Sequence, residues 1–389
     1  MSPMRAEQIV NFGAGPAKLP SCVVHQTQKD LENWNEMGVG IMEISHRSSQ
    51  FEKLMNDTRE RLCRLVGIPD DYAVLFMQGG GTLQFAAIIY NMIFKETSNV
   101  SYLVSGCWSK KAVEEGEKIL DMSRCKVNSH FIISEDGSLK NEIDWNIPTD
   151  TLYVYYCDNE TIDGIEMPTS SFIREKLDKL GINAPIVCDM SSNFLSRPID
   201  VTQFGLIFAT AQKNFGPAGC TVVIVKRSLL PTPQQRAFSV PTMMDYLIFD
   251  KYDSLYNTPP VFAISVCNLT FRWIEEQFGD LGKLANANAQ KAQRVYECID
   301  QSSGFYKCPV SINLRSRMNV VARIIETDGR ANAKLEKMFI EEAEKMGLLQ
   351  LKGHRSVGGI RISLYNSITL EETERVVDHM ISFYRNIQK

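Results

Sequence analysis

The 389-residue sequence has no apolar run that approaches the roughly 20 residues of a membrane-spanning helix. The first residues, Met1 to Arg5, also lack the apolar segment of a secretory signal peptide. A strong excess of one charge is missing too, because 42 basic and 46 acidic residues leave a net charge of −4. That balance argues against nucleic acid as the main partner. We therefore expect a cytoplasmic protein that binds neither a membrane nor nucleic acid.

Motifs for metals, disulfides and nucleotides are absent as well. The five histidines lack the spacing of metal ligands. None of the ten cysteines forms a Cys-x-x-Cys pair, and Cys188 and Cys267 lie in or beside apolar runs, so we interpret the cysteines as reduced core residues. The glycines at 79–81 do not extend to G-x-G-x-x-G, because Gln84 occupies the third position. We expect no metal site and no nucleotide fingerprint.

The sequence does contain apolar strands that alternate with helical stretches, a pattern typical of an α/β fold with a mostly parallel sheet flanked by helices. Polar residues follow several of the strands, at the edge where α/β sheets bind ligands. These strands are predicted over 72–77, 100–104, 152–156, 185–189 and 206–210, and 221–225 closes the series. Helices are predicted over 22–37, 51–66, 83–94, 110–120, 262–278, 283–302 and 331–346, and the capping box Thr369–Glu372 opens a last one.

Length and pattern together predict two domains. An irregular crossover over 239–260 marks the boundary, and a strand at 317–323 follows it among helices. We predict an N-terminal arm over 1–15 that joins the smaller domain, a large domain over 16–258 and a small α+β domain over 259–389.

One lysine stands at a distinctive position, between the predicted strand 206–210 and the turn Phe215–Gly219. Burial between apolar walls disfavours the charged amine, so we expect a lowered pKa for Lys213 and a usable nucleophile. A Schiff-base lysine requires these properties. A lone lysine is more often a surface residue at a loop edge. Which of the two interpretations holds for Lys213 therefore depends on the other residues that accompany it.

A carboxylate, Asp189, ends another buried strand 24 residues before Lys213. An unpaired charge there is costly, and a protonated pyridine ring would serve as its partner. Pyridoxal phosphate requires a lysine for its aldehyde, a carboxylate for its ring nitrogen, a phosphate cradle and a stacking surface. Lys213, Asp189, the helix start at 80–82 and Trp108 would supply them. Taken alone, the glycines are equally a tight turn, and Trp108 is an ordinary core aromatic.

Two histidine–arginine pairs, His46-Arg47 and His354-Arg355, provide a second signal, with Arg361 six residues after the latter. Paired donors suit a dianionic phosphate, and an arginine fork suits a carboxylate. Any single arginine is more often a solvated surface charge.

On these residues the chain resembles the phosphoserine aminotransferases, fold-type I pyridoxal phosphate enzymes related to the class V aminotransferases. The resemblance runs nearly end to end. The stretches that carry it are 11–17, 42–47, 78–81, 159–164, 196–200, 211–219, 256–260, 352–355 and 358–361. Two positions depart from the family pattern, since Thr82-Leu83 stands where glycine is common and Ala14 where bacterial relatives carry serine.

The resemblance implies that Lys213 forms the Schiff base, Asp189 pairs with the pyridine nitrogen and Trp108 stacks on the ring. It implies further cofactor contacts at Gly81, Thr82, Thr161, Ser191 and Gln212, joined by Asn257 and Thr258 of the partner subunit in a homodimer. It implies that Arg361 binds the substrate carboxylate, and that the substrate phosphate is bound, partly across the dimer interface, by His46, Arg47, His354 and Arg355.

The activity that the resemblance implies is ping-pong transamination from L-glutamate to 3-phosphohydroxypyruvate, giving O-phospho-L-serine and 2-oxoglutarate in L-serine biosynthesis. Two alternatives stay open. Another fold-type I activity, such as a serine–glyoxylate-type aminotransferase or a lyase, is opposed by the two histidine–arginine pairs. A non-catalytic scaffold is opposed by the pairing of Lys213 with Asp189.

Overall fold

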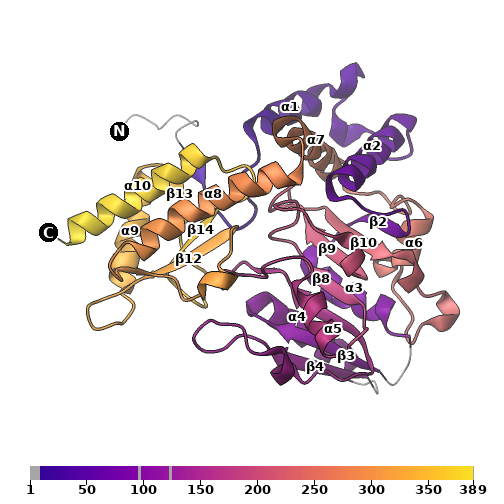
Figure 1. Cartoon of the computed structure of the whole chain (residues 1–389). Coiled ribbons are helices and arrows are strands. Elements are labelled where there is room, and N and C mark those ends of the chain that lie inside the picture. Colours follow the sequence, from indigo (N-terminus) through magenta and orange to yellow (C-terminus); the bar gives the residue numbers. More distant parts are fainter. Residues whose placement is uncertain (1–8, 95–97, 122–124, 389) are drawn as a thin grey trace.

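The computed structural model describes residues 9–94, 98–121 and 125–388, and a seven-stranded mixed sheet forms its centre (Figure 1). The strand order is β2-β10-β9-β8-β5-β3-β4. All neighbours from β9 to β4 are parallel, whereas β10 is antiparallel to both β2 and β9. The strands are β2 (Tyr72–Met77), β3 (Asn99–Val104), β4 (Lys126–Phe131), β5 (Thr151–Cys157), β8 (Ile186–Asp189), β9 (Leu206–Thr210) and β10 (Thr221–Lys226). The predicted α/β class with a mostly parallel sheet is confirmed.

Helices cover both faces of this sheet, which is why its strands are apolar in nearly every position. Successive residues of a strand point to opposite faces. In β5, Val154 and Tyr156 pack with α2 (Ser49–Val66), α5 (Phe172–Lys179) and α7 (Val261–Phe278). Tyr153 and Tyr155 pack with α3 (Gly80–Met92), α4 (Cys107–Leu120) and α6 (Tyr246–Lys251).

A second, antiparallel sheet of β11 (Tyr306–Lys307), β12 (Asn319–Ile324) and β14 (Ile360–Ser363) lies in the C-terminal part of the chain (Figure 1, orange to yellow). Its core is shared with α8 (Leu281–Asp300), α9 (Ala333–Lys345) and α10 (Leu370–Ile387). The N-terminal segment joins it, because β1 (Val10–Asn11) pairs with β13 (Leu348–Leu349) and Phe12 is buried in the same core. The domain limits at 15/16 and 258/259 stay predictions.

The elements that the sequence pattern missed are polar or short. β4 is an edge strand with alternating partly exposed residues, so it contains no apolar run. The hairpin of β6 (Asn159–Glu160) and β7 (Ile165–Glu166) is too short for a periodic signal. The first helix, α1 (Ser21–Glu32), ends before the predicted Met37, because Asn33 leaves helical geometry and Asn35 adopts a φ of 49°.

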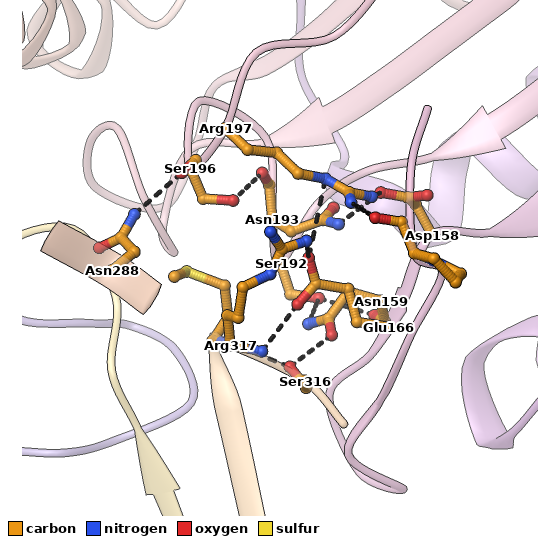
Figure 2. A network of polar contacts seen from close by, with 12 residues as sticks. Asp158, Asn159, Glu166, Ser192, Asn193, Ser196, Arg197, Asn288, Ser316 and Arg317 are labelled. Atoms are coloured by element: carbon orange, nitrogen blue, oxygen red, sulfur yellow. Dashed lines mark hydrogen bonds and ion pairs between the residues drawn. The ribbon is translucent and has the colours of Figure 1, made fainter. Parts of the chain in front are cut away.

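A buried polar network joins the two sheets (Figure 2). Arg197 donates to Asp158 at 2.7 Å and lies 3.7 Å from Glu166. Asn159 donates to Ser192 Oγ at 2.7 Å, and its Oδ1 accepts from Ser316 Oγ at 2.6 Å. Loops after β5 and β8 thereby hold the segment that leads into β12.

Two further observations concern membrane-spanning helices and metal-binding groups. Among the described residues, no helix is both long and apolar enough to cross a membrane. Within the same part of the chain, no group of three or more His, Cys, Asp or Glu side chains is arranged to hold a metal ion.

Replacing Arg197 by Met should lower the free energy of unfolding by about 3–5 kcal/mol, because Asp158 and Glu166 would remain buried without this cation. Urea unfolding measures the change. Arg294, which pairs with Glu374 at the surface, offers the matched control, and its Met variant should unfold much as the wild type does. Equal effects of the two substitutions would contradict the structural role of Arg197.

Candidate active site

A cavity of about 260 Å³ opens at the carboxyl edge of the central sheet. Segments from five parts of the chain form it, namely the N-terminal arm, the start of α3, the start of α4, the loop after β8 and the loop after β9. Its lining residues are Ala14, Gly15, Gly80, Gly81, Thr82, Phe85, Trp108, Asp189, Ser191, Thr210, Gln212 and Lys213.

Sheet topology brings the two charged residues of the cavity together. Asp189 is the last residue of β8, and Lys213 follows the end of β9 by three residues. The two strands are parallel neighbours, so their carboxyl ends meet at one edge. The strand register therefore brings Asp189 and Lys213 to the same cavity, as their sequence spacing leads us to expect.

Both ionisable groups are shifted by burial. Burial lowers the pKa of Lys213, while the nearby Asp189 carboxylate opposes the shift. Burial likewise raises the pKa of Asp189, against the Lys213 charge and a hydrogen bond that its Oδ1 accepts from the Ser191 N–H at 2.8 Å. Lys213 Nζ donates to Thr161 Oγ1 at 3.1 Å, which fixes the amine at the cavity wall. The direction expected for the lysine pKa is confirmed.

The start of α3 provides a place for an anion. Gly79 and Gly80 adopt φ values of 90° and 67°, a left-handed geometry that favours glycine and turns the chain sharply from β2 into the helix. The first turn of the helix, with Gly81 and Thr82, then borders the cavity. Helix N-termini attract anions through their N–H groups and dipole. The buried Ser191 hydroxyl, which has no partner among the described residues, faces the same space.

An aromatic wall completes the cavity. Trp108 is the second residue of α4, and its ring centroid lies 5.5 Å from Lys213 Nζ. A second lysine, Lys111, places its Nζ 4.4 Å from the same centroid. The indole Nε1 is buried without a partner in the described part of the chain.

These features fit pyridoxal phosphate. The unmatched Ser191 hydroxyl and the α3 N-terminus suit its phosphate, and Trp108 offers a flat surface for its ring. A buried Asp189 suits a protonated ring nitrogen, because the pair would relieve the cost of the desolvated carboxylate. Lys213 supplies the amine that an aldehyde requires.

Cationic groups lie near the cavity, although Arg361, His354 and Arg355 do not line it. Arg361, in β14, is partly buried, and its Nε has no partner among the described residues. Its charge is close enough to oppose protonation of both Lys213 and His354. Burial, Arg361, Lys111 and the exposed Arg355 together lower the pKa of His354. This cluster presents donors for an anionic substrate.

The remaining predicted residues lie outside the cavity of this chain. Arg47 is exposed, the buried His46 Nε2 has no partner among the described residues, and neither lines the cavity. Thr258 is exposed and accepts a hydrogen bond from Gln78 Nε2 at 3.1 Å through its backbone oxygen. Asn257 does not line the cavity either. Their predicted roles stay predictions.

Sequence reasoning missed three charged residues beside the site, Lys111, Glu160 and Asp163. Lys111 follows Trp108 by three residues, a spacing that places both on one side of a helix. Glu160 and Asp163 belong to the 159–164 motif, in which only Thr161 had been given a role, and their carboxylates bind the first turn of α4.

Comparisons with known proteins agree with this geometry. Residues 9–376 match the family model "Aminotransferase class-V". The chain is 44% identical over 378 residues to a phosphoserine aminotransferase of Drosophila melanogaster, covering 97% of this chain and 99% of that protein. It is 44% identical over 382 residues to a probable phosphoserine aminotransferase of Dictyostelium discoideum, covering 97% of each.

Solved structures are similar in the same way. The phosphoserine aminotransferase from Bacillus circulans subsp. alkalophilus superimposes with a TM-score of 0.86 at 38% identity, covering 98% of this chain and 99% of that one. A pyridoxal phosphate-bound phosphoserine aminotransferase from Trichomonas vaginalis gives a TM-score of 0.88 at 38% identity, with coverage of 96% and 99%.

Replacing Asp189 by Asn should make the Lys213 amine about tenfold more reactive at neutral pH, because loss of the carboxylate lowers the lysine pKa further. Labelling of the cofactor-free protein by trinitrobenzenesulfonate, followed by peptide mass spectrometry across pH, measures the change. Labelling of the exposed Lys251 serves as the internal control and should not respond. A Lys213 profile that stays in place would contradict the electrostatic pairing.

Proposed function

Because the chain belongs to the class-V aminotransferase family, and within it to the phosphoserine aminotransferases, we propose that it transfers the amino group of L-glutamate to 3-phosphohydroxypyruvate with pyridoxal phosphate as its cofactor. The products are O-phospho-L-serine and 2-oxoglutarate, in L-serine biosynthesis. One observation carries the proposal: a desolvated lysine and a buried carboxylate share a cavity with a helix N-terminus and an indole ring.

Pyridoxal phosphate, when bound, supplies an aldehyde for the substrate amine and a protonated ring that withdraws electrons from the reacting carbon. Lys213 Nζ would hold the aldehyde and would move a proton to and from the substrate α-carbon. Thr161 Oγ1 orients that amine through its 3.1 Å hydrogen bond. Asp189 would hold the proton of the ring nitrogen, and Trp108 would offer its indole to the ring.

Other residues of the site bind the phosphate of the cofactor. We assign Gly81, Thr82, Ser191 and Gln212 to this role, since all of them line the cavity near the α3 N-terminus. Asn257 and Thr258 reach the site of the partner subunit in a homodimer. This assignment agrees with their position outside the cavity of their own chain.

Substrate recognition divides between two anionic groups. Arg361 binds the carboxylate that both substrates carry, because it is a partly buried arginine whose charge acts on Lys213. His354, Arg355 and Lys111 bind the substrate phosphate beside the cavity. His46 and Arg47 bind it from the partner subunit.

No disulfide joins the described cysteines, which supports a cytoplasmic location.

The two alternatives predict different behaviour. A serine–glyoxylate-type aminotransferase or a lyase would not need the cationic cluster around His354. A scaffold would have no use for a desolvated lysine. More distant aminotransferase structures, such as a ureidoglycine–glyoxylate aminotransferase at 13% identity and a TM-score of 0.76, show the fold alone.

The direct test is the pair of half-reactions on the purified, cofactor-loaded protein. Glutamate should shift the visible absorbance band, and 3-phosphohydroxypyruvate should restore it, while unphosphorylated hydroxypyruvate should restore it far more slowly. Replacing Lys213 by Ala should reduce turnover by about 10⁴-fold or more. Near-normal transamination by that variant would end this mechanism, and a preference for the unphosphorylated acid would favour the serine–glyoxylate type.

The two anion sites should separate in kinetics. Replacing Arg361 by Met should lower kcat/KM by about 10²-fold for glutamate and for the keto acid, since both lose a carboxylate contact. Replacing Arg355 or Lys111 by Met should lower kcat/KM mainly for the phosphorylated substrate. The neighbouring exposed Lys110 provides the matched control for Lys111, and its Met variant should behave as the wild type. Equal losses for both substrates in the Arg355 variant would contradict the assignment.

A further inference from the structure

Two carboxylates of the 159–164 turn bind the first turn of α4. Glu160 accepts hydrogen bonds from the Trp108 N–H at 2.7 Å and the Ser109 N–H at 2.8 Å, and also from the Ser109 hydroxyl. Asp163 accepts one from the Cys107 N–H at 2.8 Å. Three successive backbone amides of the helix that carries the indole are therefore held by one turn.

The Glu160 carboxylate is completely buried, with a relative exposure of 0%. No ion pair joins it to a basic residue in the described part of the chain, so its charge depends on these hydrogen bonds and on the helix dipole. Burial and the neighbouring Asp163 carboxylate raise the pKa of Glu160 to about 7, although the donors from Ser109 and Trp108 oppose the shift. Burial thus opposes the ionised form of Glu160 that these hydrogen bonds favour.

Close approach at Gly106 shows that this contact is built into the fold. A Cβ atom at Gly106 would lie 2.5 Å from Asp163 Oδ2 and 2.8 Å from the Glu160 carboxyl carbon. A side chain at position 106 would therefore displace one or both carboxylates from the first turn of α4.

We infer that Glu160 is a positioning residue: its ionised carboxylate holds the first turn of α4, and with it Trp108, against the turn that carries Thr161, and protonation releases this hold. The expected effect of Glu160 on turnover rests on the proposed function. The hold of Glu160 on α4 does not, because it depends only on contacts within the chain.

The chemical reason is the number of donors that meet Glu160. A carboxylate accepts at both oxygens, and here backbone N–H groups meet both of them. A glutamine amide must turn its NH₂ donor toward one of those N–H groups, and a protonated carboxyl accepts more weakly than the carboxylate at both oxygens. Glu160→Gln therefore imitates the protonated state. Asp163 meets a single backbone donor from α4, so Asp163→Asn can keep its bond through the amide oxygen.

The other titratable groups around Glu160 are Asp163 of its own turn, Cys107 of α4, Tyr155 and Cys157 of β5, and Lys213 after β9. Burial raises the pKa of both thiols and of the phenol, so these three stay neutral around pH 7. Asp163→Asn tests the remaining carboxylate separately.

Hydrogen exchange of the full-length, cofactor-free protein tests the structural part. After correction for intrinsic rates, amides 107–109 should exchange about tenfold faster at pH 6 than at pH 8 in the wild type. In Glu160→Gln they should exchange fast at both values. Glu117→Gln, a change at an exposed position of α4, is the matched control and should behave as the wild type. Protection that does not depend on pH in the wild type would overturn the inference, whether or not the variant folds.

The pH profile of kcat in the loaded enzyme tests the catalytic part. The wild type should lose activity as the pH falls through about 7, whereas Glu160→Gln should be about tenfold slower at pH 8 and vary little between pH 6 and 8. Asp163→Asn should keep a pH dependence but shift the loss of activity to lower pH, because the carboxylate that helps to raise the pKa of Glu160 is then gone. A Glu160→Gln enzyme with the wild-type profile would overturn the positioning role. An inactive wild type with pH-dependent exchange would instead count against the proposed function alone.

Discussion

The site depends on two opposite charges, Asp189 and Lys213, held out of water at one edge of the central sheet. Burial raises the pKa of the acid and lowers that of the lysine, and each charge partly restores the other. Relative to the unfolded chain, the contribution of Asp189 to stability falls as the pH rises from the ordinary pKa of the carboxyl, 3.8, to its raised folded pKa. The contribution of Lys213 rises with pH from its lowered folded pKa up to the ordinary pKa of the amine, 10.5. Between those windows both groups cost stability, which the apolar layers on the two faces of the sheet offset. The apolar core therefore keeps this unfavourable pair buried, and burial keeps the Lys213 amine reactive.

Parallel topology explains why so many polar groups meet at that edge. β2, β9, β8, β5 and β3 run in the same direction, since β10 is antiparallel to both of its neighbours. Each carboxyl end then delivers a loop or a helix start to the same place, including the α3 N-terminus after β2 and the α4 N-terminus after β3. Arg361, which we propose to bind the substrate carboxylate, lies instead in β14 of the second sheet. The active site thus requires the two sheets to keep a fixed relation.

The central sheet could be predicted from the sequence because strands buried on both faces are continuous apolar runs, and β2 and β9 begin and end where that pattern placed them. Lys213 and Asp189 could be predicted for the same reason, because Lys213 follows such an apolar run and Asp189 ends one. Glu160 was not, because its role depends on donors 51 and 52 residues away that no local pattern links to it. His46, Arg47, Asn257 and Thr258 mark another limit. Their proposed partner is a second subunit, and neither periodicity nor the fold of one chain contains that contact.

The 159–164 turn contacts Lys213, the helix that bears Trp108 and the second sheet. A six-residue stretch with neither a helix nor a long strand therefore positions much of the site. Thr161 bonds Lys213, while Glu160 and Asp163 hold the helix that bears Trp108. Asn159 donates to Asn319 at 2.8 Å, at the start of β12. Gly164 packs against Val321, where a Cβ atom would approach the valine to 2.5 Å, and Val321 pairs with Arg361 across the β12–β14 ladder. The proposed carboxylate-binding arginine is therefore placed relative to the Lys213 amine through the contacts of a single turn. A shift of the second sheet would reach Lys213, Trp108 and Arg361 together, so the geometry of substrate and cofactor binding is set by the same few contacts.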